Sequence, residues 1–389
     1  ALHEKENIND VWAKLKDPDT YVVVQTAPSV RVALGEEFKM EIGTNVTGKM
    51  VSALKRLGFD KVFDTNTGAD FTIMEEATEF VKRFKENDNL PMTTSCCPGW
   101  VRFAEMEYPE NLSHLSSCKS PHQMFGAIIK SYYAEKNKID PKNIYVVSVM
   151  PCIAKKFERQ REEMKVNGLW DVDSVITTRE LARMIKQANI EFDKLEDETF
   201  DSPMGEATGA AAIFGVTGGV MEAGPDLLTL EAALRTAYEL ITGKELKKLE
   251  FEEIRGAKGI KKATVQIGDK EVKVAVAHGL SNARKIMEEI KNGTSDYQFV
   301  EVMACPGGCI MGGGQPIKSS KVRMTVDVAA KRAEAMYSID ERSVIRKSHE
   351  NSILKQIYKE YIGKPGEHKA HELLHTHYMK REMNFEDIS

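Results

Sequence analysis

The chain's six cysteines are its most distinctive chemical feature. Cys96 and Cys97 are adjacent in TTSCCPGW, Cys152 lies in VMPCIAKKFE, and Cys305 and Cys309 lie in ACPGGC. A cysteine pair combined with single cysteines from other segments is typical of a thiolate-bound iron–sulfur cluster, whereas zinc usually takes CxxC pairs. The alternative interpretation of ACPGGC is a tight turn with two buried thiols. Adjacent side chains diverge in most backbone conformations, so we expect Cys96 and Cys97 to have separate roles.

Charged residues accompany two of these segments. Lys155 and Glu158 follow Cys152, and a helix beginning there would place all three near one face. The competing interpretation is a free buried cysteine beside an ordinary ion pair. Glu79 and Arg83 have i, i+4 spacing, which by itself indicates only a surface salt bridge.

Three further patterns carry less weight. HELLH at 371–375 matches the HExxH zinc-protease pattern, but only 14 residues follow it, and a third ligand would have to be Glu386 or a distant residue. We interpret it as an exposed or capping histidine cluster near the chain end.

GGGQP at 312–316 has the glycines of a phosphate loop without a following GK[ST], so glycine there is expected to let backbone approach a cofactor. Cys118 is expected to be a small buried hydrophobe.

The composition is that of an ordinary globular protein. The chain has 389 residues, of which 42% are hydrophobic and 29% charged, and its net charge is −5. These values give no support to a nucleic-acid or anionic-membrane partner. The sequence lacks an 18-residue apolar run and a signal peptide, and its six cysteines are too few for a disulfide scaffold. We therefore expect no membrane span and a cytoplasmic location.

Three apolar runs at 22–24, 145–150 and 299–303 have the length and β-branched content of strands. Each run ends directly in a distinctive segment, TAPS, MPC or ACPGGC. Ligands of open α/β sheets gather beyond the carboxyl ends of the strands, so these segments are expected to share one site. Strands that alternate with helices favour an α/β fold with largely parallel sheets.

Other elements follow from periodicity and caps. Helices are expected at 72–87, at about 281–291, and from a capping box of Thr177 and Glu180 to about Ala188. TVQI and EVKVAVA are expected to form a hairpin around Gly268 and Asp269. The part from about 326 reads as mostly helical, with a GKPGE turn at 363–367.

The segments TSCCPGW, MPCxxKKFE and ACPGGCxxGGGQP, in that order, closely resemble the three signature segments of the iron-only, or FeFe, hydrogenases. The resemblance extends from about Val22 to Lys380 and includes AIFGVTGGVMEA at 212–223 and SHEN at 348–351. It implies two lobes built on largely parallel sheets, an active site in the cleft between them, and a mostly helical C-terminal part. Residues 1–389 would form one two-lobed catalytic domain, with 1–20 as a lead-in and 326–389 as the helical part.

The resemblance also implies a cofactor. The family carries the H-cluster, a 4Fe-4S cubane joined through one cysteine sulfur to a two-iron unit with CO, cyanide and a bridging dithiolate amine. Position by position, the cubane ligands would be Cys97, Cys152, Cys305 and Cys309, with Cys309 also bridging to the two-iron unit. The implied reaction is the reversible combination of protons and electrons to give dihydrogen.

A proton relay is implied as well. Cys96 occupies the place of the family cysteine that exchanges protons with the dithiolate amine, and a free thiol has a reference pKa of about 8.5. Behind it, the resemblance places Glu158, Ser116, Glu79 and then Arg83 near the surface.

Residues around the two-iron unit are implied by the same resemblance. Those expected near the cyanides are Lys155, Pro28 and Ser29, and those expected in the lining are Pro121, Met150, Met303 and Phe214. His122 stands where the family commonly has Gln, which would add a titratable donor beside the two-iron unit.

Two departures from the family pattern concern its surroundings. Segment 224–231, GPDLLTLE, interrupts a stretch that usually continues as one helix, and no cysteine precedes Cys96, so no N-terminal ferredoxin-like domain is expected in this chain. Electrons would come to the cubane from ferredoxin or another electron-transfer subunit, and maturation proteins would supply the two-iron unit. The alternatives are a hydrogen-sensing relative and a non-catalytic 4Fe-4S assembly-type relative. The presence of Cys96 and Lys155 disfavours both.

Overall fold

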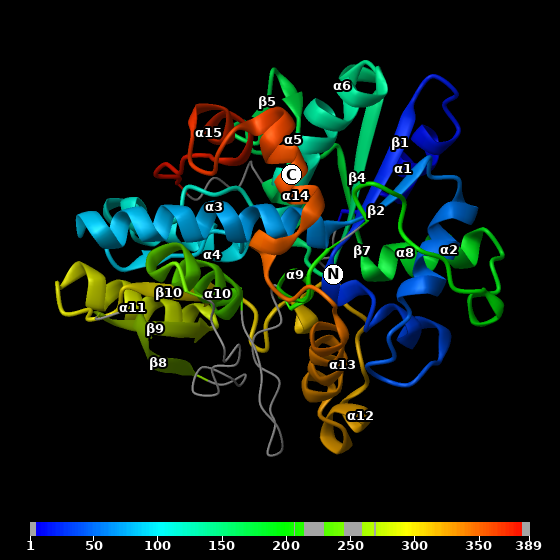
Figure 1. The fold of residues 1–389 in the computed structure, drawn as a ribbon. Helices are drawn as coiled ribbons and strands as arrows, with labels where there is room; N and C mark the ends of the chain where they lie inside the picture. Colours follow the sequence, from blue (N-terminus) through cyan, green and yellow to red (C-terminus); the bar gives the residue numbers. More distant parts are fainter. Residues whose placement is uncertain (1–4, 206, 214–228, 245–258, 268–269, 383–389) are drawn as a thin grey trace.

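The computed structural model describes residues 5–205, 207–213, 229–244, 259–267 and 270–382. Two four-stranded sheets form the two halves of the molecule (Figure 1). The α/β architecture with largely parallel strands is the one expected from the sequence.

The first sheet is entirely parallel, with the order β2-β1-β4-β7. Its strands are β1 (Tyr21–Thr26), β2 (Lys61–Asp64), β4 (Ile144–Met150) and β7 (Ser174–Thr177). Val24 pairs with Val62 on one side and with Val147 on the other. All three valines are fully buried, as is typical of parallel strands that are covered on both faces.

The second sheet has the order β3-β10-β9-β8. Its strands are β3 (Met92–Thr93), β10 (Phe299–Met303), β9 (Lys270–His278) and β8 (Ile260–Ile267). The first three are parallel, and β8 pairs antiparallel with β9, which confirms the expected hairpin. Its turn residues, Gly268 and Asp269, lie outside the described residues. A small antiparallel pair, β5 (Lys165–Val166) and β6 (Leu169–Trp170), is separate from both sheets.

The α-helices in the described residues have the following bounds: α1 (Ile8–Leu15), α2 (Thr47–Leu57), α3 (Thr65–Glu86), α4 (Pro98–Glu107), α5 (Pro121–Ile128), α6 (Ala134–Asn137), α7 (Ala154–Glu158), α8 (Thr178–Gln187), α9 (Gly209–Ala212), α10 (Thr229–Thr242), α11 (Leu280–Lys291), α12 (Ser320–Thr325), α13 (Val328–Arg342), α14 (Ser352–Ile357) and α15 (His368–Leu374). The capping box of Thr177 and Glu180 begins α8 as expected. The C-terminal part is mostly helical, and its turn at 363–367 precedes α15. Residues 224–228 of the unusual segment lie outside the described residues.

Helix α3 begins at Thr65, seven residues before the expected start at 72. Thr, Asn and Gly in its first turn are weak helix formers, but the Asp64 side chain caps the helix by accepting a hydrogen bond from the Asn66 N–H at 3.0 Å. Its first half packs through Phe71 into the core of the first sheet, and its second half packs through Phe80 into that of the second. This helix therefore joins the two halves (Figure 1).

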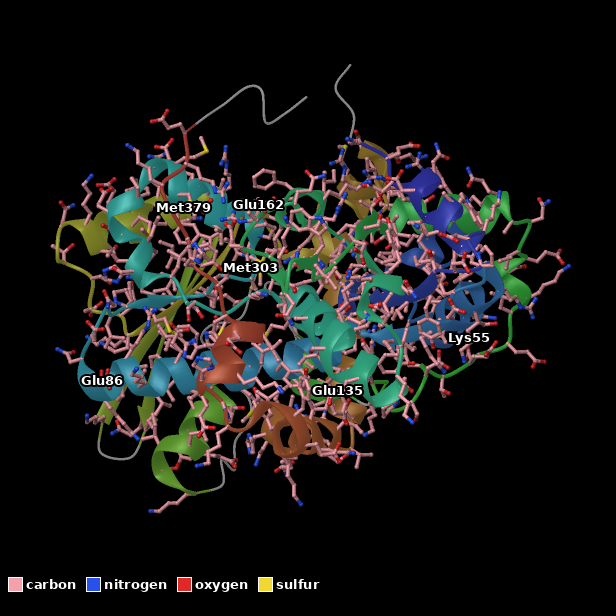
Figure 2. All side chains as sticks on the ribbon, turned by 90° about the horizontal axis from the view of Figure 1, so that it is seen from above. Lys55, Glu86, Glu135, Glu162, Met303 and Met379 are labelled. Carbon is pink, nitrogen blue, oxygen red and sulfur yellow. The ribbon has the colours of Figure 1, made fainter. Side chains whose placement is uncertain are left out.

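Figure 2 shows that Met303, at the end of β10, lies toward the middle of the molecule, whereas Lys55 and Glu86 lie toward opposite ends. The interior position of Met303 marks where the two halves meet. No helix in the described part of the chain is long and apolar enough to span a lipid bilayer.

The crossing of α3 over α5 allows no extra atom at Gly68. A Cβ there would lie 2.3 Å from the Pro121 carbonyl oxygen and 2.7 Å from Phe125 Cβ. We predict that Gly68→Ala lowers the free energy of unfolding by about 1–3 kcal/mol, because the backbones must separate. Helix propensity alone would instead stabilise this variant by about 1 kcal/mol, so a raised thermal midpoint would contradict the prediction. Gly313→Ala is the control, because its added Cβ would make only an ordinary 3.4 Å contact with Ile153.

Candidate active site

Strand ends from both sheets surround one cavity. β1 and β4 lead from the first sheet into Ala27 and Pro151, and β3 and β10 lead from the second into the Cys96 and Ala304 segments. Residues from all four segments line the same cavity. The carboxyl ends of the strands therefore converge on one site, as the sequence predicted.

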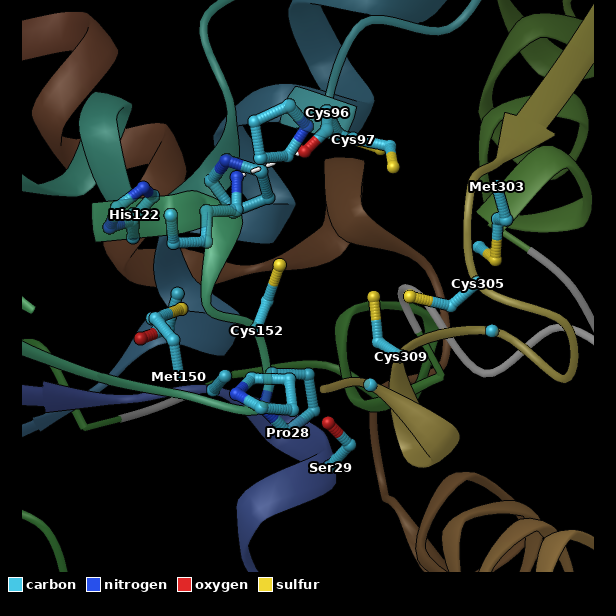
Figure 3. Close-up of a pocket in the computed structure, with 18 of the residues that line it drawn as sticks. Pro28, Ser29, Cys96, Cys97, His122, Met150, Cys152, Met303, Cys305 and Cys309 are labelled. Carbon is cyan, nitrogen blue, oxygen red and sulfur yellow. Dashed lines mark hydrogen bonds between the residues drawn. The ribbon is translucent and has the colours of Figure 1, made fainter. Parts of the chain in front are cut away.

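Four cysteine side chains project toward this shared space (Figure 3). Cys97 precedes α4, Cys152 precedes α7, Cys305 follows β10, and Cys309 begins the short 3₁₀ helix η8 (Cys309–Met311). The Ala304 N–H donates a hydrogen bond to Cys97 Sγ at 3.4 Å. The structure thus brings together the four cysteines that the resemblance implies as cluster ligands.

The donor set fits an iron–sulfur cluster. Burial, followed by the neighbouring Cys97, raises the pKa of Cys152 to about 12, and burial raises the pKa of Cys305 and of Cys309 as well. The protein alone therefore holds Cys152, Cys305 and Cys309 as neutral thiols. A cationic iron group at their centre would stabilise the thiolates that burial disfavours.

Glycines hold the ACPGGC segment against the MPC segment. A Cβ at Gly312 would lie 2.3 Å from the Pro151 carbonyl oxygen, and one at Gly314 would lie 3.0 Å from the Cys152 nitrogen. GGGQP was expected to let backbone approach a cofactor. In the structure Gly312 and Gly314 let this segment approach the Pro151–Cys152 backbone, which fixes Cys152 beside Cys309. Gly312 also lines the cavity, and its approach to a cofactor stays a prediction.

Lys155 is a buried cation at the edge of the cavity. Its Nζ donates hydrogen bonds to the Cys96 carbonyl oxygen at 2.9 Å and to Glu158 Oε2 at 2.9 Å. Burial opposes the charged ammonium, but the Glu158 carboxylate outweighs it and raises the pKa of Lys155. Burial also opposes ionisation of Glu158, yet Lys155 and His122 lower the pKa of Glu158 to about 2. Both members of the pair are therefore charged at neutral pH.

His122 is committed to this ion pair. Its Nε2 lies 2.5 Å from Glu158 Oε2, and because Glu158 is ionised, Nε2 must carry the donated proton. Burial, with the nearby Lys155 cation, lowers the pKa of His122. His122 is thus a neutral histidine at neutral pH, whose Nε2–H is already bonded to Glu158. Its role as a titratable donor beside the two-iron unit stays a prediction.

The remaining expected lining residues also lie on the cavity. They are Pro28, Ser29, Pro121, Met150 and Met303. Their contacts with a cofactor stay a prediction. Phe214 lies outside the described residues.

A line of hydrogen-bonded polar residues runs from Ser116 toward the surface. The Ser116 hydroxyl donates to Glu79 Oε2 at 2.9 Å, and Arg83 Nη2 donates to Glu79 Oε1 at 2.6 Å. The side chains of Glu79 and Arg83 are each 14% exposed, so this end reaches solvent.

Glu158 is not part of this line. Its carboxylate accepts hydrogen bonds from Lys155, Ser120 and His122, whereas the Ser116 hydroxyl is directed to Glu79. The expected link from Glu158 to Ser116 is therefore wrong. Glu158 stabilises Lys155 instead.

Glu76, which sequence reasoning missed, is a buried acid that lies close to both Ser116 and Cys96. The Ser116 hydroxyl favours ionisation of Glu76, and the ionised form of Glu76 opposes ionisation of the Cys96 thiol. Burial, with the nearby Glu79 and Glu301 carboxylates, raises the pKa of Glu76 to about 8. The sequence contained one signal, because Glu76, Glu79 and Arg83 are spaced i, i+3, i+7 and share a face of α3.

Two weaker patterns have clear outcomes. Cys118 is fully buried in the core of the first sheet, as expected. In HELLH, His371 is exposed, but His375 is buried and turned toward Glu75. Glu372, the residue that would act as base in a zinc protease, is exposed and pairs with His368 at 3.5 Å. The zinc-protease arrangement is absent from the described residues.

Comparison with known proteins identifies related sequences. The profile of the family described as "Iron only hydrogenase large subunit, C-terminal domain" matches residues 20–313, and that of "Iron hydrogenase small subunit" matches residues 326–381. The chain is 53% identical over 98% of its length to NADP-reducing hydrogenase subunit HndD of Solidesulfovibrio fructosivorans and 52% identical over 98% to iron hydrogenase 1 of Clostridium pasteurianum. It spans 64% and 65% of the lengths of these two relatives.

Solved structures agree with this assignment. An apo variant of the [FeFe]-hydrogenase HydA1 from Chlamydomonas reinhardtii superposes with a TM-score of 0.83 at 41% identity, covering 97% of this chain and 100% of that one. Protein NAR1 of Arabidopsis thaliana is more distant, at 32% identity over 97% of this chain and 82% of that protein. A relative with periplasmic in its name, a large hydrogenase subunit of Nitratidesulfovibrio vulgaris, is 52% identical over 80% of this chain and 72% of its own length.

We predict that Glu76 stays protonated at neutral pH. Its pKa of about 8 in the folded protein lies above the ordinary value near 4.3, so the stability associated with its neutral form is present at low pH and is lost as pH rises through about 8. An infrared titration should show a protonated-carboxyl band that disappears with a midpoint near 8 and is absent in Glu76→Gln. Glu86→Gln, an exposed change at the end of the same helix, should retain the band. A midpoint near 4 would contradict the prediction.

Proposed function

This chain belongs to the iron-only hydrogenase family, and from that premise we propose that it catalyses the reversible reduction of protons to dihydrogen at an H-cluster. The observation that carries the proposal is the shared cavity. Four cysteine sulfurs, the Cys96 thiol and the buried Lys155 cation all line it. A plain cluster-binding protein would have no use for the last two.

The cofactor would be held by residues already in position. Cys97, Cys152, Cys305 and Cys309 would bind the cubane, and Cys309 would also carry the two-iron unit. When bound, the group supplies the redox-active iron at which protons and electrons combine. Lys155 would offer a fixed positive charge to the cyanide ligands, and Pro28 and Ser29 would also lie near them.

Proton transfer would use the chain's own side chains. The hydrogen bond from Lys155 to the Cys96 carbonyl oxygen fixes the backbone that carries the thiol. Burial, with the nearby Glu76 and Glu301 charges, raises the pKa of Cys96, so its resting form is the protonated donor. Glu76 would return a proton to Cys96, and Ser116 and Glu79 would connect Glu76 to the surface at Arg83.

The apolar part of the lining has a separate task. Pro121, Met150 and Met303 would exclude water from the two-iron unit, which keeps a coordination position open and strengthens the electrostatic effect of Lys155.

The two alternative functions are less well supported. The assembly-type reading has relatives at 30% to 32% identity, well below the 52% and 53% of the hydrogenase relatives. The sensory interpretation gives no role to the Cys96 thiol or to the hydrogen bonds that connect Ser116, Glu79 and Arg83.

Electron delivery requires a partner. The name of the HndD relative identifies it as a subunit of a larger NADP-reducing enzyme, which supports an electron-transfer protein as partner here. We propose ferredoxin or a similar subunit as the immediate donor, maturation proteins as the source of the two-iron unit, and the cytoplasm as the location. Residues 1–389 would act as one two-lobed catalytic domain.

The decisive experiment combines two measurements on one anaerobic sample of matured protein. Infrared spectroscopy should show bound CO and cyanide, and a hydrogen assay should show evolution with a low-potential electron donor. Iron–sulfur absorption without the diatomic bands, after co-expression with maturation proteins, would contradict the proposal and favour an assembly-type function.

We predict that replacing Cys96 and replacing Cys97 cause different defects. Cys96→Ala should retain the iron content and the infrared bands but lower turnover by about 10²-fold or more, because a positioned proton donor is lost. Cys97→Ala should lose cubane iron. Cys118→Ala, which removes a buried thiol outside the cavity, should keep near-normal turnover. Normal turnover in Cys96→Ala would show that protons bypass this thiol.

A further inference from the structure

A second group of possible metal ligands lies outside the cavity. One side-chain ligand atom from each of Glu79, Cys118 and His375 lies within 4.8 Å of the other two. The Cys118 sulfur is 3.9 Å from Glu79 Oε2. Cys118 and His375 are held together by their backbones, which form an isolated antiparallel bridge. The arrangement is therefore built into the fold rather than formed by mobile surface side chains.

His375 is oriented as a metal ligand would be. Its Nε2 lies 3.0 Å from Glu75 Oε2, a carboxylate oxygen that also accepts from the Gly366 N–H at 2.8 Å. Because this carboxylate is an acceptor, Nε2 carries the proton and Nδ1 keeps its lone pair. Nδ1 meets only the Ser117 hydroxyl, at 2.8 Å, among its hydrogen-bond partners in the described residues. Zinc-binding histidines commonly donate their second nitrogen to a carboxylate in this way.

The chemistry of the three donors favours zinc. A thiolate, an imidazole and a carboxylate are its usual protein ligands, at about 2.0–2.3 Å, and a tetrahedral arrangement leaves the fourth position to water. Ligand atoms at those distances lie roughly 3.3–3.8 Å apart. The Cys118 to Glu79 separation of 3.9 Å is already close to this range.

We propose that Glu79, Cys118 and His375 form a Zn²⁺ site. Binding would form bonds from zinc to Cys118 Sγ, His375 Nδ1 and a Glu79 oxygen. The Cys118 thiol would release its proton to solvent, and the Ser117 hydroxyl would give up its bond to Nδ1. No electron transfer is involved.

The surroundings attract a cation and give it access. Glu75 and Glu79 lie one turn apart on α3, and Arg83 lies one turn further on. His371 is exposed on α15, and its ring centroid lies 4.1 Å from that of His375. An incoming ion therefore meets a solvent-facing imidazole directly above the buried one. HELLH thus contributes to a metal site through one buried histidine, with the other ligands from distant segments.

Occupation of the site would affect the proposed function, on which this consequence rests. Glu79 accepts the hydrogen bond from Ser116 and connects it to the surface. A zinc-bound Glu79 could no longer exchange protons there. Zinc is therefore a reversible inhibitor of turnover that acts at the outer end of the proton line and leaves the cofactor untouched.

Binding is tested first, without reference to activity. Zn²⁺ is titrated into the cluster-loaded protein, iron content is checked, and X-ray absorption at the zinc edge is recorded. We expect one tightly bound zinc with one sulfur neighbour and otherwise nitrogen or oxygen. A zinc environment without sulfur in the natural chain would overturn the proposal, and this readout does not depend on any variant folding.

Variants locate the site. Cys118→Ala should remove the sulfur neighbour and weaken zinc binding by at least about tenfold, and Glu75→Gln should weaken it by about 10- to 100-fold through the orientation of His375. His368→Ala is the matched control, because it removes an exposed histidine from the same helix. Sulfur retained in Cys118→Ala, or equal loss of binding in His368→Ala, would overturn the assignment.

The effect of zinc on turnover is tested in a separate experiment. Zinc should slow hydrogen evolution by the natural chain, a chelator should restore it, and Cys118→Ala should be active and at least tenfold less sensitive. Sulfur-bound zinc without inhibition would overturn the link to proton transfer. A protein that binds zinc with this signature but evolves no hydrogen would contradict the proposed function and leave the site in place.

Discussion

The structure depends on the convergence of strand ends from one parallel sheet and one largely parallel sheet. β1 and β4 of one sheet and β3 and β10 of the other deliver their following residues to the same cavity. Parallel strands present all their carboxyl ends at one edge, so two such edges can bring together segments more than 200 residues apart in sequence. The four cysteines proposed as cluster ligands, the Cys96 thiol and the Lys155 cation are all placed by this one arrangement. The glycine contact with Pro151 then fixes the spacing between segments from opposite sheets.

Around this centre, each buried charge has a specific partner. Lys155 remains charged because Glu158 is beside it, and Glu158 remains charged because Lys155 and His122 bond to it. The nearby Arg83 cation favours ionisation of Glu76, but burial and the neighbouring Glu79 and Glu301 carboxylates outweigh it and keep Glu76 neutral. The two buried acids therefore have opposite protonation states at the same pH. The ionised Glu158 is suited to hold Lys155 in place, whereas the protonated Glu76 is suited to carry a proton.

Sequence reasoning identified the elements whose signal is local. The strand at 145–150, the capping box of Thr177 and the cysteine segments are marked by hydrophobic runs, spacing and residue type, all readable without the fold. The early start of α3 was missed because Thr65 and Gly68 disfavour a helix, and only the Asp64 cap and packing on α5 overcome that tendency.

Glu158 was expected beside Ser116, in the place where Glu76 lies, for a different reason. Sequence spacing places Glu76 and Glu79 on one helical face, but it does not say which carboxyl reaches Ser116. That contact depends on the path of residues 115–118, which no local pattern predicts. The inward turn of His375 likewise depends on its backbone bridge to Cys118, far away in the sequence.

Helix α3 has a mechanical consequence. Its first half is part of one core and its second half part of the other, so a hinge motion that opened the cavity would pull Phe71 or Phe80 out of its packing. Exposing either ring would cost roughly 2 kcal/mol before any other contact is lost. The two sheets are therefore expected to keep their separation whether the cavity is empty or filled. The cysteines therefore line a rigid, preformed cavity, and a prosthetic group is expected to bind in it without rearrangement of the two lobes.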